Sequence, residues 1–145
     1  MRLDREAWRF IARRYLPWFA LLSLAWEVAQ LPLYTLWKEA TPGHVAFAVA
    51  HCTIGDMLIG AASLLLALIL GRERAFGTRT LLWLLILAPA YTLYSEWLNT
   101  ALGRWSYSEL MPLVRLGPVE IGLSPLLQWL VIPPLALHFA KRRIQ

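Results

Sequence analysis

The sequence is poor in charged residues, which make up 16% of its 145 positions. An average soluble protein contains about 25%. Hydrophobic residues, in contrast, make up 59% of the chain. Because so little polar sequence remains for a separate soluble domain, the composition predicts a single membrane domain that covers residues 1–145.

Cysteine and recognised catalytic motifs are also scarce. The only cysteine, Cys52, excludes an intrachain disulfide, and its apolar surroundings favour a small buried thiol. The sequence contains no phosphate-binding loop, nucleotide-binding motif or Ser or Cys nucleophile constellation. It also lacks the Glu-x-x-His pair of di-iron helix bundles. Any chemistry must therefore come from other polar residues.

Long apolar stretches dominate what is present. A helix needs about 20 apolar residues to cross ~30 Å of hydrocarbon. Four stretches reach that length, so we expect an all-α integral membrane protein, a four-transmembrane-helix bundle. Basic and apolar residues alternate before the first stretch, which predicts a short amphipathic N-terminal surface helix. The expected spans are 15–37, 45–70, 81–102 and 118–139, and the outer loop is 103–117.

The basic residues are distributed unequally between the two sides of this bundle. Eleven of the 14 Lys and Arg residues lie before the first stretch, between the second and third, or after the fourth. Under the positive-inside rule, both termini are therefore expected to be cytoplasmic. We expect a multi-pass protein of the cell inner membrane. The lipid bilayer, rather than nucleic acid, accounts for the net charge of +5.

Two carboxylates inside the apolar stretches are each followed, three positions later, by an amide side chain. These pairs are Glu27 with Gln30 and Glu96 with Asn99, and each pair projects from one face of its helix. A carboxylate near the centre of a membrane helix costs about 2.5–3.5 kcal/mol on insertion scales. Such a residue is a functional-site hypothesis by default. We therefore predict a buried polar site that contains both carboxylates.

The second stretch adds His51 and Asp56. They lie about 140° apart around a helix, so they can flank one cavity from two sides. Counted along the helices, the polar residues fall between the outer interface and roughly the midplane, so the site is expected to face the periplasmic or external side. In the outer loop, Trp105 or Tyr107 would cover the cavity if the loop acts as a lid. The candidate ligand-binding residues are Gln30, Asn99, Glu120, Gln128, Trp105 and Tyr107.

Three kinds of function fit this pattern. The first is an intramembrane enzyme for a lipid-soluble substrate, with Glu96 and Glu27 as general acid and base, His51 as proton relay and Asp56 beside them. In a metal-assisted form, the same four residues would hold a divalent metal such as Zn, Fe or Mn. The second is a carrier of a ligand, ion or proton, or an accessory subunit with membrane protein partners. The third is a purely structural polar core that joins the helices.

Overall fold

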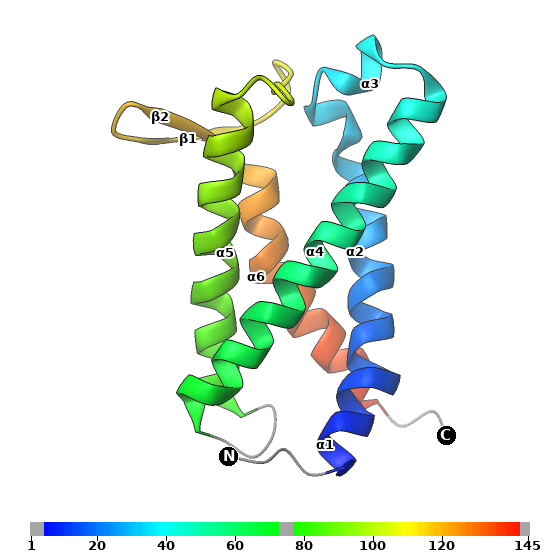
Figure 1. Ribbon diagram of the computed structural model, residues 1–145, viewed down its shortest axis with the longest axis vertical. Helices are drawn as coiled ribbons and strands as arrows, with labels where there is room; N and C mark the ends of the chain where they lie inside the picture. The colour runs from blue at the N-terminus through cyan, green and yellow to red at the C-terminus, as the bar shows by residue number, and fades with distance from the viewer. Residues whose placement is uncertain (1–4, 73–76, 143–145) are drawn as a thin grey trace.

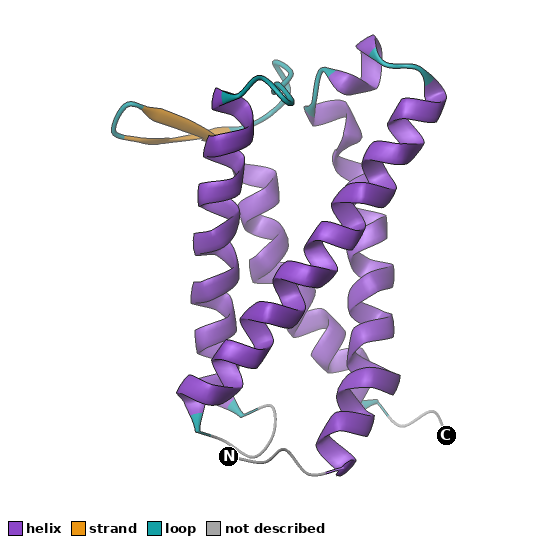
Figure 2. Ribbon diagram, viewed as in Figure 1, coloured by secondary structure: helices purple, strands orange, loops and turns teal. Residues whose placement is uncertain are grey.

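The computed structural model describes residues 5–72 and 77–142, which form a bundle of helices with a small hairpin at one end (Figures 1 and 2). The helices confirm the all-α bundle expected from the sequence. In chain order the elements are α1 (Arg5–Phe10), the π-helical turn η1 (Ile11–Tyr15), α2 (Leu16–Gln30), the 3-10 turn η2 (Leu31–Leu33), α3 (Leu36–Glu39), α4 (Pro42–Gly71), α5 (Thr78–Ala101), β1 (Leu113–Leu116), β2 (Val119–Gly122) and α6 (Leu123–Lys141).

Four helical segments are long and apolar enough to cross a membrane. Their outward surfaces are apolar as well: Phe47, Leu58 and Ile69 on α4 are each about two-thirds exposed, at 65%, 67% and 65%. Extensive exposed apolar surface marks contact with a membrane or a partner. The arrangement therefore fits a multi-pass membrane protein. The four segments are Arg5–Leu33, Pro42–Gly71, Thr78–Ala101 and Leu123–Lys141.

The first span differs from the expected one at its beginning. We expected a separate surface helix, but α1 continues through η1 into α2 without a break. The physical reason is packing, since Ile11 and Tyr15 of η1 are buried in the hydrophobic core rather than lying at the surface. Residues 1–4 of the expected surface helix lie outside the described residues.

The fourth span also begins later than expected, at Leu123 instead of residue 118. Residues 113–122 form the antiparallel β1–β2 hairpin, in which Leu116 pairs with Val119. The chain reverses at Gly117, whose φ of +62° is readily adopted only by glycine. The apolar residues before Leu123 are therefore strand residues, and the hairpin projects from one end of the bundle (Figure 1). We call this end the hairpin end.

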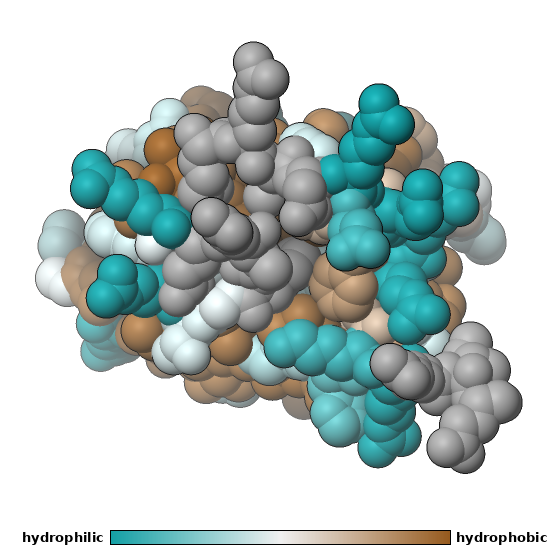
Figure 3. Space-filling model, turned by 90° about the horizontal axis from the view of Figure 1, so that it is seen from below, coloured by the Kyte–Doolittle hydropathy of each residue, from teal (hydrophilic) through white to brown (hydrophobic). Residues whose placement is uncertain are grey.

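The opposite end, which we call the basic end, holds the hydrophobic core. Phe19 of α2 packs on Trp129 of α6 with ring centroids 5.8 Å apart. Gly60 of α4 faces this contact, because a Cβ there would lie only 2.7 Å from the Phe19 ring. Hydrophilic side chains surround this end when the molecule is seen from below (Figure 3). The bundle is thus tightly packed on the basic side of its middle.

Helix α4 crosses the bundle diagonally. At the basic end it lies beside α5, where Gly71 approaches the Thr80 backbone closely, and toward the hairpin end it moves away from α5 (Figure 1). Helix α6 crosses behind it in the opposite sense. Consequently, α4 and α5 lie close together at the basic end and apart at the hairpin end.

The loop that follows α5 is fastened to the chain that follows α2. The Thr35 N–H donates to the Ser106 carbonyl at 3.0 Å, and the Ser108 N–H donates to the Leu33 carbonyl at 2.9 Å. Between these bonds, Tyr34 and Tyr107 form an antiparallel bridge. These backbone contacts hold the outer loop over the diverging helices.

Candidate functional site

A cavity of about 400 Å³ lies between α2, α4, α5 and α6 on the hairpin side of the core. All four residues predicted as catalytic line it: Glu27, His51, Asp56 and Glu96. Glu27 and Glu96 are both buried, with 7% of each residue exposed. The structure therefore brings together side chains from three helices that the sequence could relate only by depth.

Glu96 on α5 is held by two tyrosines from outside the helices. The Tyr107 hydroxyl donates to Glu96 Oε2 at 2.6 Å, and the Tyr34 hydroxyl lies 3.5 Å from the same atom. Burial and, secondarily, the nearby Glu96 charge raise the pKa of both tyrosines above the ordinary phenol value. The two phenols therefore stay protonated and act as donors, which stabilises an ionised Glu96.

Glu27 on α2 and Asp56 on α4 form a carboxyl pair deeper in the cavity. They lie close enough for their charges to interact. The Gln30 amide donates to Glu27 Oε1 at 2.8 Å, and the Gln128 amide of α6 donates to Asp56 Oδ2. Two neighbouring carboxyl groups in a poorly solvated site do not readily both ionise, so one of them tends to keep a proton. The pair is therefore a place where a proton is held close to the cavity.

Gln30 contacts Glu27 and joins α2 to α6, whereas Asn99 bonds within α5 and to the loop that follows it. The Gln30 side-chain oxygen accepts from the Ser124 hydroxyl of α6 at 2.9 Å. At the rim, Arg104 donates to Asn99 Oδ1 at 3.0 Å, and the Asn99 amide donates back to the Ser95 carbonyl at 2.7 Å. Every one of these side chains except Ser124 lines the cavity. Their amide groups thus have defined partners.

Two buried donors on the cavity wall lack a partner within the described chain. Thr92 is 7% exposed, and its hydroxyl makes no hydrogen bond with any described residue. The Trp105 indole N–H faces Glu96 closely enough to interact with its charge, but does not reach hydrogen-bond geometry with a described group. Buried polar groups in native proteins are usually hydrogen-bonded. Unpartnered donors that face a cavity therefore indicate a ligand or ordered water.

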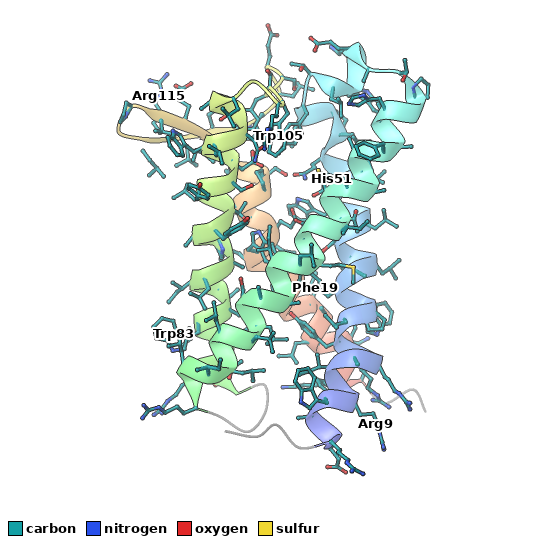
Figure 4. All side chains as sticks on the ribbon, viewed as in Figure 1. Arg9, Phe19, His51, Trp83, Trp105 and Arg115 are labelled. Carbon is teal, nitrogen blue, oxygen red and sulfur yellow. The ribbon has the colours of Figure 1, made fainter. Side chains whose placement is uncertain are left out.

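His51 occupies the edge of the cavity rather than its centre. Its ring stacks on Phe47, one helical turn earlier, with centroids 5.7 Å apart, and the residue is exposed. Figure 4 shows His51 on α4 and Trp105 near the same end of the molecule. Cys52, which we interpreted as a buried thiol, is half-buried and also lines the cavity. These residues lie between the carboxylates and the membrane-facing surface.

The predicted metal ligands do not converge. Within residues 5–72 and 77–142, no three His, Cys, Asp or Glu side chains are grouped so that they can hold a metal ion. Glu27 and Asp56 accept from amides, Glu96 accepts from phenols, and His51 stacks on Phe47. The donor set therefore does not fit the Zn, Fe or Mn site considered from the sequence.

Glu120 lies away from the cavity. It belongs to β2, is exposed, and forms an ion pair with Arg115 of β1 at 2.6 Å. Glu120 was expected to bind a ligand together with Gln128 of the fourth span, but the residues before Leu123 are not helical and Glu120 lies in the hairpin. Conversely, the sequence did not identify Tyr34 as a site residue. It indicated only an aromatic anchor at the interface, because the contact depends on how the outer loop folds.

The chain matches no known protein family, no curated protein and no solved structure. Its class is therefore defined by the fold and the cavity alone: a bundle of four membrane-span-length helices with a cavity near one end that carboxylate side chains help to line.

Proposed function

We propose that the protein is a multi-pass enzyme of the cell inner membrane that performs acid–base chemistry on a lipid-soluble substrate. The observation that carries this proposal is the presence of two different carboxyl sites on one cavity wall. Glu96 accepts hydrogen bonds from phenols, whereas Glu27 and Asp56 each accept a hydrogen bond from an amide and lie close enough for their charges to interact. General acid–base catalysis needs a proton donor and a proton acceptor that face the same space.

In this proposal, Glu96 is the proton acceptor and the Glu27–Asp56 pair is the proton donor. Tyr107 donates to Glu96 at 2.6 Å, and this bond stabilises the charged form of the carboxylate. Gln30 and Gln128 are positioning residues, because their amides fix the two carboxyl groups of the pair. His51, which lines the cavity, is the candidate proton relay for the pair.

The surroundings of the cavity favour a substrate that arrives from the lipid. Both helices that diverge toward the hairpin end, α4 and α5, contribute to its wall (Figure 1). Phe47 and Ile54 on α4 are 65% and 60% exposed around this region. With the termini in the cytoplasm, as the basic residues predict, the cavity faces the periplasmic or external side.

Two observations favour an enzyme over the alternatives. A continuous path for ions or protons needs polar groups across the whole bundle, but the core residues Phe19, Leu64 and Trp129 fill the basic side. A purely structural polar core needs each polar group to have a partner, whereas the Thr92 hydroxyl has none in the described chain. An accessory subunit would bind a ligand in the same cavity but would not convert it, so the experiment below separates it from an enzyme.

The proposal is tested by following deuterium into lipids. Membranes that contain the parent protein or Glu96→Gln are incubated in D₂O with a total lipid extract, and the lipids are compared by mass spectrometry. Proton transfer to carbon leaves a deuterium that survives washing in H₂O. We expect at least one lipid-soluble species to gain deuterium, or to disappear, with the parent protein alone. Identical lipid profiles for the two folded proteins would overturn the proposal.

A further inference from the structure

We infer that the cavity binds a long-chain lipid whose polar group carries no negative charge, such as a long-chain alcohol or amine, and that it rejects anionic lipids. The inference rests on the proposed function in one respect, since it takes this cavity as the ligand site. It adds the chemical class of the ligand. Charge, hydrogen-bonding groups and the shape of the wall each contribute to it.

The charge of the wall disfavours an anion. Glu27, Asp56 and Glu96 all face the cavity, and none of them forms an ion pair with a Lys or Arg of the described chain. The lining includes one guanidinium, Arg104, which is exposed at the rim and donates to Asn99. A phosphate, sulfate or carboxylate inside the cavity would therefore meet like charges in a poorly solvated space, where repulsion is strong.

The unpartnered Thr92 hydroxyl indicates what a ligand offers in return. Thr92 lies on α5 one helical turn before Glu96, lines the cavity and is 7% exposed. A threonine hydroxyl both donates and accepts, so it can pair with an alcohol or an amine. With Glu96 as a neighbouring acceptor, the wall offers one acceptor and one hydroxyl to a small, uncharged or cationic polar group.

The rest of the wall has the character of a lipid site. The volume of about 400 Å³ lies within the ~300–1,000 Å³ range of small-molecule pockets. Leu31, Phe47 and Ile59 supply apolar wall. Gly55 leaves part of the α4 wall without a side chain, and a Cβ there would meet no atom within 4 Å. An alkyl chain can therefore lie against α4 while its polar group reaches α5.

Gly55 provides a sharp experimental test. The Gly55→Leu variant fills the cavity without a clash at the Cβ position. The matched control is Gly43→Leu, in the first turn of the same helix, where a Cβ also has open space but the residue does not line the cavity. Purified full-length proteins in a neutral detergent are titrated with hexadecanol, hexadecylamine and hexadecyl sulfate, and bound probe is measured by native mass spectrometry.

We expect hexadecanol and hexadecylamine to bind at one site, and hexadecyl sulfate to bind at least about tenfold more weakly. Gly55→Leu should weaken the two favoured probes at least about tenfold, whereas Gly43→Leu should leave them unchanged. Thr92→Val should weaken hexadecanol by about two- to tenfold, the loss of one hydrogen bond. Thr53→Val is its control, because that hydroxyl bonds to the Val49 carbonyl of its own helix.

Sulfate binding as tight as that of the alcohol, and equally sensitive to Gly55→Leu, would overturn the inference on charge. Binding of all probes without any effect of Gly55→Leu would overturn the assignment of the cavity. Neither result depends on conversion of a lipid. Selective binding with identical lipid profiles for the parent protein and Glu96→Gln would leave the ligand class standing and refute the enzyme.

Discussion

The hydroxyl of Tyr107 lies 2.6 Å from the carboxylate of Glu96, eleven residues earlier in the chain. This bond joins the outer loop to α5, and the Tyr34–Tyr107 bridge joins the same loop to the end of the first span. A carboxylate buried among apolar helices is thus held by two segments that lie outside them. The geometry of the site therefore depends on the loop as much as on the bundle.

Replacing Tyr107 with phenylalanine should loosen this arrangement. The change removes one donor and leaves a buried carboxylate with fewer partners, which typically costs about 1.5–3 kcal/mol. We expect Tyr107→Phe to lower the free energy of unfolding in detergent by that amount, and to reduce Glu96-dependent lipid conversion. Tyr94→Phe is the control, because Tyr94 is 53% exposed on α5 and does not line the cavity. Equal stability of the two variants would show that the bond contributes nothing.

Two glycines of α4 should respond in opposite ways to alanine. At Gly60, a Cβ would lie 2.7 Å from the Phe19 ring, whereas at Gly55 it would meet open space. Overpacking costs about 1–3 kcal/mol, so Gly60→Ala should be destabilising. Gly55→Ala should be neutral or stabilising by up to about 1 kcal/mol, because alanine favours the helix. Thermal unfolding in detergent compares the two, and the reverse order would contradict the packing described for the core.

The sequence predicted the four long helices because apolar length is a strong signal for a membrane span. It also related Glu27 to Gln30 and Glu96 to Asn99, since the helical repeat places each pair on one face. In the structure, both residues of each pair line the same cavity.

What the sequence could not predict depends on contacts between distant segments. Residues 118–122 are apolar enough to begin a helix, and a short apolar run does not distinguish a helix from a strand. The Gly117 turn decides in favour of the hairpin, and this removes Glu120 from the site. Likewise, the bonding of Tyr34 and Tyr107 to Glu96 follows from the way the outer loop pairs with the end of the first span.

The orientation in the membrane gives a further prediction. Reporter fusions at Thr41 and Glu109, both at the hairpin end, should report an external location, and a fusion at Thr78 should report the cytoplasm. The expectation follows from the excess of basic residues before the first span, between the second and third spans, and after the fourth. Alkaline phosphatase and green fluorescent protein fusions distinguish the two sides. The opposite pattern would place the cavity toward the cytoplasm and change the leaflet from which a substrate arrives.

The last prediction concerns Glu96 itself. Glu96→Gln keeps the volume and the hydrogen-bonding capacity of the side chain but removes its charge. If the residue only joins helices, an amide serves nearly as well, because such bonds are typically worth well below 2 kcal/mol in membranes. If it is the proton acceptor, the variant should insert and fold normally while lipid conversion falls by at least about a hundredfold.

The control for Glu96→Gln is Glu109→Gln, at an exposed position of the outer loop that does not line the cavity. This variant should match the parent protein in both folding and conversion. Unfolding in detergent and the deuterium measurement are carried out on the same preparations, so that loss of structure is separated from loss of chemistry. An amide at position 96 cannot accept the proton. A Glu96→Gln protein that folds and converts lipid like the parent would therefore exclude Glu96 from the chemistry.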